Sequence, residues 1–284
     1  MRILVTGYTG QLGYDVVQFG QSSGLDMIGV GSNDLDIRDG AKVIEYMRRL
    51  KPDAIIHCAA YTAVDKAEDD RVECWKVNVE GTRNIAIAAK ELNAILLYIS
   101  TDYVFNGEGE SAYDESSVPD PIGYYGLTKY EGERIVQQLM DQWFIVRISW
   151  VFGLNGNNFV KTMLRLAETR DVINVVHDQI GSPTYTQDLA RLLIDMIQSD
   201  KFGIYHATNE GFCSWAEFAE EIFRQAQLNV KVKRISSIEY PTRAKRPKNS
   251  KLSKQMLVNN GFDPLPLWQD AVRRFVELLI ERES

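Results

Sequence analysis

The feature that most constrains the fold of this chain is a regular alternation of short apolar segments with longer amphipathic ones over its first 150 residues. The short segments have the length and apolar character of buried strands, and they lie at 3–5, 27–30, 54–57, 95–99 and 144–148. The longer segments have helical length and spacing, and they lie at 11–22, 41–50, 72–92 and 124–142. This alternation predicts an α/β fold in which a doubly wound parallel sheet carries helices on both faces.

A glycine-rich turn follows the first predicted strand. Gly7, Gly10 and Gly13 have the spacing GxxGxxG and lead into the first predicted helix. Glycine is needed where the backbone turns tightly and where a pyrophosphate must touch bare main chain. The helix amino terminus then offers N–H groups and a positive dipole end to the phosphates. A lone glycine motif is weak, but at this place in the chain it predicts a Rossmann-type dinucleotide site.

The end of the second predicted strand bears on the choice of cofactor. NAD-selective sites usually place Asp or Glu there for the ribose hydroxyls, whereas this chain has Gly31 and Ser32. We therefore expect NADP(H), with NAD(H) left open because Asp34 and Asp36 lie close by. The small residues that begin the segment 59–62, after the third strand, would let a cofactor approach the sheet.

A tyrosine and a lysine begin the helix predicted at 124–142. Tyr125 and Lys129 are four residues apart and so share one helix face. A nearby ammonium favours the phenolate and would bring the tyrosine pKa, ordinarily about 10, nearer the pH at which acid–base catalysis is effective. Thr101 lies at the end of the fourth strand, where active sites of doubly wound sheets form, and its hydroxyl could bond a substrate carbonyl. YxxxK alone is common, but this order of groups predicts an oxidoreductase.

The pattern loosens after about residue 150. Segments 159–168, 185–199, 214–227 and 267–282 are expected to be helical and 203–207 to be a strand, with Ser214 and Glu217 forming a capping box. We expect residues 1–150 to be a dinucleotide-binding domain that carries the catalytic residues. Residues 151–284 are expected to form mainly a smaller substrate lobe, with some segments returning to the sheet.

Composition excludes several functions. The net charge of −7 argues against nucleic-acid binding, and no apolar run approaches the roughly 20 residues of a membrane span. Cys58, Cys74 and Cys213 form no CxxC pair, which favours the cytoplasm. The three histidines are isolated, so no metal cluster is predicted, and His57 is expected to be a satisfied core residue.

A basic strip contrasts with the overall acidity. Between positions 231 and 254, nine Lys and Arg residues are opposed only by Glu239. The strip could hold an anionic substrate locally or could be a solvated basic loop, and the sequence leaves both open.

Segments spread along the chain resemble the extended short-chain dehydrogenase/reductase family and, within it, the dTDP-4-dehydrorhamnose reductases. The resemblance covers nearly the whole chain and rests on the segments 7–13, 34–37, 59–62, 100–105, 125–129, 147–153, 178–184 and 246–250. It implies NAD(P)H-dependent reduction of the C4 keto group of dTDP-4-dehydro-L-rhamnose.

The resemblance also assigns roles to individual residues. Tyr125 would be the proton donor and Lys129 would bind the nicotinamide ribose, while Thr101, Asp102 and Trp150 would face the sugar. Residues implied to bind the dinucleotide are Gly10, Gln11, Leu12, Gly13, Asp36, Ile37, Ala59, Ala60, Tyr61 and Thr62, which add to Gly7.

Arg246 heads the Arg-Pro-Lys-Asn-Ser motif that the resemblance links to this branch of reductases. A guanidinium can grip a phosphate bidentately, so Arg246 is expected to act on the diphosphate of a dTDP-sugar. Some relatives bind Mg²⁺ through acidic residues at a dimer interface, and Asp15 falls near one such position. No further ligand is identified, so no metal is assigned, and a homodimer remains an expectation.

The sequence bears differently on three other functions. A sugar-nucleotide dehydratase would carry Asp-Glu after the hydroxyl residue, whereas this chain has Asp102-Tyr103, so elimination is not favoured. A reductase or epimerase of another nucleotide sugar stays open. So does a non-catalytic regulatory subunit resembling the methionine adenosyltransferase β subunit, although no catalytic group is lost here.

Overall fold

The centre of the molecule is a six-stranded parallel sheet, seen in a computed structural model that describes residues 1–283. Its strand order is β10-β5-β4-β3-β1-β2, with every neighbouring pair parallel. The strands are β1 (Arg2–Thr6), β2 (Asp26–Val30), β3 (Ala54–His57), β4 (Ile95–Thr101), β5 (Trp143–Ile148) and β10 (Gly203–His206). The predicted doubly wound α/β fold is confirmed.

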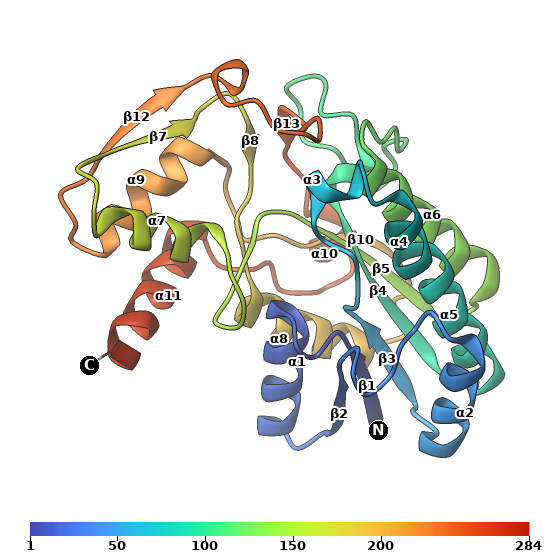
Figure 1. The fold of residues 1–284 in the computed structure, drawn as a ribbon. Coiled ribbons are helices and arrows are strands. Elements are labelled where there is room, and N and C mark those ends of the chain that lie inside the picture. Colours follow the sequence, from blue (N-terminus) through green and yellow to red (C-terminus); the bar gives the residue numbers. More distant parts are fainter. Residues whose placement is uncertain (284) are drawn as a thin grey trace.

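Helices cover both faces of this sheet (Figure 1). On one face, α1 (Gln11–Ser22) and α8 (Thr186–Ile197) pack on strand residues such as Ile3 and Val5. On the other, α2 (Gly40–Leu50), α5 (Thr82–Glu91) and α6 (Tyr124–Leu139) pack on residues such as Leu4. Successive side chains of a strand point to opposite faces, so strands that are apolar throughout are buried on both sides.

The second half of the chain contributes to the sheet and also builds a separate core. Strand β10 lies at the sheet edge beside β5, and α8 packs against α1. The separate core contains α7 (Phe159–Ala167), α9 (Trp215–Gln225) and α11 (Trp268–Glu283), with β7 (Val172–Val176) and β12 (Lys231–Ile235) paired beside them. The division of the chain at residue 150 stays a prediction, although β10 does return to the sheet.

Short elements connect these parts. They are α3 (Val64–Ala67), α4 (Arg71–Trp75), the π-helical segment η1 (Lys76–Gly81), η2 (Asp102–Val104), β6 (Val151–Phe152), β8 (Ile180–Gly181), β9 (Thr184–Tyr185), β11 (Cys213–Ser214), η3 (Ser237–Glu239), β13 (Asn249–Ser250) and α10 (Gln255–Asn259).

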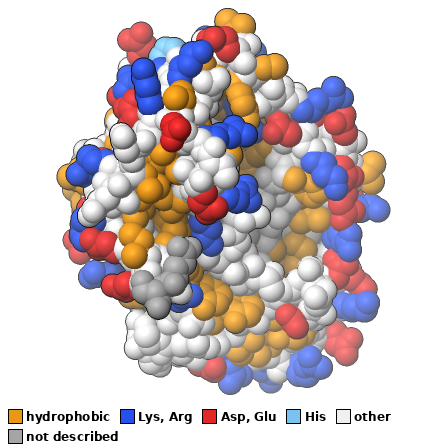
Figure 2. All heavy atoms as spheres, turned by 60° about the vertical axis from the view of Figure 1, so that its left-hand side comes forward, with side chains coloured by type: hydrophobic (Ala, Val, Ile, Leu, Met, Phe, Trp, Pro, Cys, Tyr) orange, Lys and Arg blue, Asp and Glu red, His pale blue; other side chains and the backbone are white. Residues whose placement is uncertain are grey.

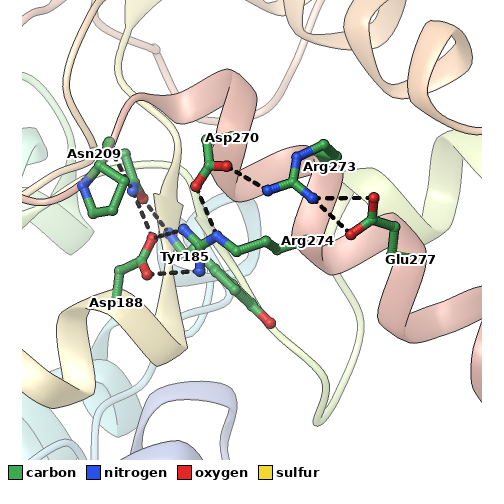
Figure 3. A network of polar contacts seen from close by, with 8 residues as sticks. Tyr185, Asp188, Asn209, Asp270, Arg273, Arg274 and Glu277 are labelled. Atoms are coloured by element: carbon green, nitrogen blue, oxygen red, sulfur yellow. Dashed lines mark hydrogen bonds and ion pairs between the residues drawn. The ribbon is translucent and has the colours of Figure 1, made fainter.

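A polar network fixes α11 to α8 where the two cores meet (Figure 3). Arg274 makes two hydrogen bonds to the Asp188 carboxylate, at 2.8 and 2.7 Å, and a third to Asp270. Asn209 donates to Asp188 at 2.8 Å and accepts from the main-chain N–H of Tyr185. Planar, bidentate pairs of this kind add geometric specificity, so the network sets how the carboxy-terminal helix lies against the sheet domain.

Two expectations about local structure need correction. The helix predicted at 72–92 is interrupted by the π-helical segment η1, which contains the buried Asn78, whose side chain bonds the main chain of Tyr61. The strands β7 and β12 were not predicted. Strand β12 lies in the basic strip and exposes Lys231 and Lys233, so it does not have the apolar character of a buried strand. The capping box of Ser214 and Glu217 is confirmed.

One buried ion pair lies beneath the sheet's functional edge. Arg147 on β5 donates to both carboxylate oxygens of Glu133 on α6, at 2.9 and 2.7 Å, and both side chains are almost fully buried. Glu133 also accepts from the Ser100 hydroxyl, and Arg147 contacts His206 at 3.4 Å. The pair joins α6 to three strands.

We expect Glu133→Gln to lower the free energy of unfolding by about 3–5 kcal/mol, because it leaves the Arg147 charge buried without a counter-ion. Urea unfolding followed by circular dichroism measures the loss. The matched control is Glu131→Gln, which breaks an exposed pair with Arg134 and should cost no more than about 1 kcal/mol. Equal small losses in both variants would contradict this role.

Candidate active site

A cleft of about 720 Å³ opens along the carboxyl ends of the parallel strands. Strand order reverses between β1 and β3, and doubly wound sheets bind ligands at such a switch point. All predicted site residues but Arg246 line the cleft, namely Gly7, Gly10, Gln11, Leu12, Gly13, Asp36, Ile37, Ala59, Ala60, Tyr61, Thr62, Thr101, Asp102, Tyr125, Lys129 and Trp150.

The glycine-rich turn forms one end of this cleft. Gly7 has φ +71°, and a side chain there would meet the main chain of Ala59 at 2.6 Å. A side chain at Gly13 would meet the Gly7 carbonyl oxygen at 2.4 Å. The turn therefore packs closely against the end of β3 and the start of α1. Bare main chain and the helix amino terminus line the cleft as a result. That lining fits the phosphates of a dinucleotide.

The end of β2 forms the next part of the wall. Gly31 donates its N–H to Asp34, whereas Ser32 is exposed and carries no charge. Arg38 also lines the cleft, and it pairs with Asp36 and Glu73. The Arg38 guanidinium lowers the pKa of Asp36 to about 2. Gly31 and Ser32 carry no carboxylate of their own, but the Asp34 carboxylate binds the Gly31 N–H at the strand tip, and the Arg38 cation lines the same wall. The wall therefore offers an acceptor for ribose hydroxyls as well as a cation for a 2′-phosphate.

Close packing brings the catalytic helix against the end of β4. A side chain at Gly126 would meet the Tyr103 carbonyl oxygen at 2.1 Å, so only glycine permits this approach. Tyr125 and Thr101 line the cleft together, and the Thr101 hydroxyl donates to Asp102 at 3.0 Å. The Tyr125 ring meets that of Tyr103 edge-on at 5.7 Å. The structure thus brings together the hydroxyl and the phenol that the sequence predicted.

The pKa of Tyr125 shifts in the direction opposite to the one predicted from the sequence. Lys129 was expected to lower the tyrosine pKa, but burial dominates and raises the pKa of Tyr125, with the Asp102 carboxylate acting in the same direction. The phenol therefore stays protonated at neutral pH. A protonated phenol is the form that a proton donor requires.

Lys129 is buried on the same helix face. Its ammonium lies over the Tyr98 ring, 4.0 Å from the centroid, and its side chain is only 3% exposed. Burial lowers the pKa of Lys129 to about 7, while the Glu133 carboxylate opposes that shift. Lys129 therefore lines the cleft at a position where burial disfavours its positive charge.

Asn78 belongs to the site although the sequence argument missed it. Its side chain accepts from the Tyr61 N–H at 2.8 Å and donates to the Tyr61 carbonyl and to Thr128, which precedes Lys129. It thereby ties a cleft-lining loop to the catalytic helix. The π-helical segment η1 provides its placement, and such segments recur at functional sites.

The residues implied to face the sugar lie at the other end of the cleft. Burial raises the pKa of Asp102 to about 6, and its second carboxylate oxygen is buried without a hydrogen-bond partner in the described structure. Trp150, at φ +48°, stacks on Trp215 with ring centroids 3.7 Å apart. An orphaned acceptor beside an aromatic wall suits a hydroxylated ligand.

Arg246 lies outside the cleft lining but next to it. Its guanidinium donates to Asp65 at 2.8 Å. Burial raises the pKa of Tyr103, a cleft residue, and the Arg246 charge opposes that rise. The Nε of Arg246 is buried and has no hydrogen-bond partner within residues 1–283. By contrast, Lys245 and Lys248 are exposed, so of these three cations only Arg246 is partly buried.

Four of the nine cations in the basic strip pair with acids from elsewhere in the chain. Ion pairs join Arg234 to Glu220, Arg243 to Asp69, Arg246 to Asp65 and Lys254 to Glu210. Figure 2 shows Lys and Arg side chains interspersed with Asp and Glu over this face of the molecule. The strip therefore combines paired cations with exposed ones such as Lys231, Lys233 and Lys245.

The buried titratable residues His57 and Asp15 lie outside the cleft lining and have structural partners. His57 contacts the hydroxyls of Thr6 at 2.6 Å and Thr82 at 3.2 Å, as expected of a satisfied core histidine. The buried Asp15 carboxylate accepts from the Thr186 hydroxyl. In the part of the chain that the structure describes, no group of three or more His, Cys, Asp or Glu is arranged to hold a metal ion. No helix there is both long and apolar enough to span a bilayer.

Comparison with known proteins places this cleft in a family. The family model described as "RmlD substrate binding domain" matches residues 1–280. The dTDP-4-dehydrorhamnose reductase of Aggregatibacter actinomycetemcomitans is 41% identical, over 96% of this chain and 97% of the relative. The dTDP-4-keto-6-deoxy-D-glucose reductase of Streptomyces niveus is 34% identical, over 100% of this chain and 99% of the relative.

A solved structure agrees closely with the fold described above. The crystal structure of the Bacillus anthracis dTDP-4-dehydrorhamnose reductase in complex with NADP has a TM-score of 0.95 and 44% identity, and 99% of each chain is covered. The chain therefore belongs to the dTDP-4-dehydrorhamnose reductase family of extended short-chain dehydrogenase/reductases.

Proposed function

We propose that this chain is an NAD(P)H-dependent reductase that converts the C4 keto group of dTDP-4-dehydro-L-rhamnose to the hydroxyl of dTDP-L-rhamnose. The observation that carries the proposal is the cleft in which the glycine-rich turn, Thr101, Tyr125 and Lys129 meet. The relatives named for this reduction, and the relative bound to NADP, support it. A dTDP-sugar is the proposed partner, and the proposed location is the cytoplasm.

The cofactor would lie along the turn and the ends of β1 to β4. Gly7, Gly10, Gln11, Leu12 and Gly13 would hold its phosphates, Asp36 and Ile37 would border the adenine, and residues 59–62 would line its middle. When bound, NADPH would supply the hydride. Lys129 would bond the nicotinamide ribose, because it lines the same cleft as Tyr125 and lies one helical turn further along α6.

The chain's own chemical task is to hold and protonate the carbonyl oxygen of the sugar. Thr101 and Tyr125 would donate hydrogen bonds where negative charge develops, which is usually the largest catalytic contribution. Tyr125 would then transfer its proton to that oxygen. Because the raised pKa of Tyr125 keeps the phenol protonated at neutral pH, no separate acid is needed.

The sugar and its diphosphate would occupy the other end of the cleft. The unpartnered oxygen of Asp102 would accept from a sugar hydroxyl, and Trp150 would form the wall beside the ring. Arg246, with its unpartnered Nε, would bond the diphosphate directly or order the loop that does. A homodimer is also proposed, and it rests on the resemblance alone.

Two alternatives would give different results in one assay. A reductase of another 4-keto sugar, as in the Streptomyces niveus relative, would oxidise NADPH with a different dTDP-sugar in a panel of such substrates. A regulatory subunit would oxidise it with none. The intact set of Thr101, Tyr125 and Lys129 in one cleft favours catalysis.

We expect Tyr125→Phe to lower kcat by about 10²–10⁴-fold, the usual contribution of a positioned acid. The assay follows NADPH oxidation with dTDP-4-dehydro-L-rhamnose, and the Kd for NADPH should stay near that of the wild type. Tyr124→Phe is the matched control, since Tyr124 is the neighbouring tyrosine and its ring contacts Arg71 outside the cleft. A Tyr125→Phe enzyme with wild-type kcat would refute the assignment.

We expect Arg246→Ala to raise KM for the sugar nucleotide by about tenfold or more, since charged hydrogen bonds contribute about 1.5–3 kcal/mol each. The Kd for NADPH should not change, because Arg246 lies outside the cofactor end. Initial rates over a range of sugar nucleotide, with NADPH saturating, test this. Lys248→Ala serves as control because Lys248 is exposed in the same motif. Equal, small effects of both substitutions would show that the segment is a solvated loop that does not bind the sugar nucleotide.

A further inference from the structure

Two asparagines from the second half of the chain hold the glycine-rich turn of the first half. Asn155 lies in the loop between β6 and α7, and its side-chain amide donates to the carbonyl oxygens of Thr9 at 2.8 Å and Gly10 at 3.3 Å. Asn158 donates to the side-chain oxygen of Gln11 at 3.0 Å. The loop of residues 153–158 therefore rests directly on the turn that faces the cleft.

This loop is itself braced by hydrogen bonds. Asn158 caps α7 by accepting from the N–H of Lys161 at 3.1 Å, and it donates to the Gly153 carbonyl at 2.8 Å. The Lys161 ammonium donates to the carbonyls of Leu154 and Gly156. Gly156, at φ +73°, also lines the cleft. The asparagine amides thus project from a fixed support.

The contacts orient the peptide groups of the turn. In a trans peptide the C=O and the following N–H point in opposite directions. The Gly10 carbonyl accepts from Asn155 and from the Tyr14 N–H of α1, each at 3.3 Å, so the N–H of Gln11 is turned the other way, at the amino terminus of α1. The Gly10 N–H is already engaged by the Gly7 carbonyl at 2.9 Å, so the N–H groups at the helix start are the ones left for an anion.

We propose that Asn155 is a positioning residue for the pyrophosphate of the cofactor. It aims the main-chain N–H groups of the turn without touching the dinucleotide, so the ordering of the turn is complete before binding. Preorganised donors raise affinity because less ordering remains to oppose association. The inference rests on the proposed function only in requiring that the turn bind a dinucleotide, and it does not involve the sugar.

The test is direct binding of NADPH to the full chain without any sugar nucleotide. We expect Asn155→Ala to raise the Kd for NADPH about fivefold to tenfold, the size of effect expected from one or two neutral hydrogen bonds. Titration of reduced-nicotinamide fluorescence measures it. At saturating concentrations of both substrates, kcat should remain near that of the wild type.

A fragment of the cofactor separates positioning from general loosening of the fold. Adenosine 2′-monophosphate lacks the pyrophosphate, so its Kd should be the same in Asn155→Ala and wild type. Asn259→Ala is the matched control, because Asn259 bonds only Gln255 on the exposed helix α10 among the described contacts. An unchanged Kd for NADPH would overturn the proposal, as would an equal rise for both ligands. A wild-type chain that bound no NADPH would overturn the proposed function itself.

Discussion

The structure depends on one constraint, the parallel alignment of β1, β3, β4 and β5, which puts all their carboxyl ends at the same edge of the sheet. The glycine-rich turn, Ala59 and Thr101 follow three of those strands and meet in one cleft for that reason alone. The fourth contribution is the catalytic helix, and it reaches the edge because Gly126 lets it contact the main chain at Tyr103. Substrate and cofactor would therefore meet where the sheet ends.

Burial governs the electrostatics of that cleft. Desolvation disfavours charge, so the pKa of Tyr125 rises, that of Lys129 falls to about 7 and that of Asp102 rises to about 6. All three groups are thereby shifted toward their neutral forms. Below the floor, Arg147 neutralises the Glu133 carboxylate, which keeps that buried charge paired when the cleft is filled.

Much of this could be predicted from the sequence because the signals are local. The apolar strands, the glycine turn and the Tyr125–Lys129 spacing each lie within a few residues. Contacts between distant segments gave no such signal. Asn78 acts through Tyr61 and Thr128, and Arg246 is fixed by Asp65, so neither placement could be predicted before the chain was folded. The pKa of Tyr125 was misjudged because a motif shows a neighbouring charge but not the depth of burial.

We propose that in this cleft a hydride is added to the carbon, and a proton to the oxygen, of the C4 carbonyl group of a dTDP-4-keto sugar. The most direct measurement uses NADPH deuterated at the transferable C4 position, with dTDP-4-dehydro-L-rhamnose as substrate, and examines the product by NMR. The account predicts deuterium on C4 of the sugar and product with the configuration of dTDP-L-rhamnose. Deuterium absent from C4, or no product formed, would contradict it.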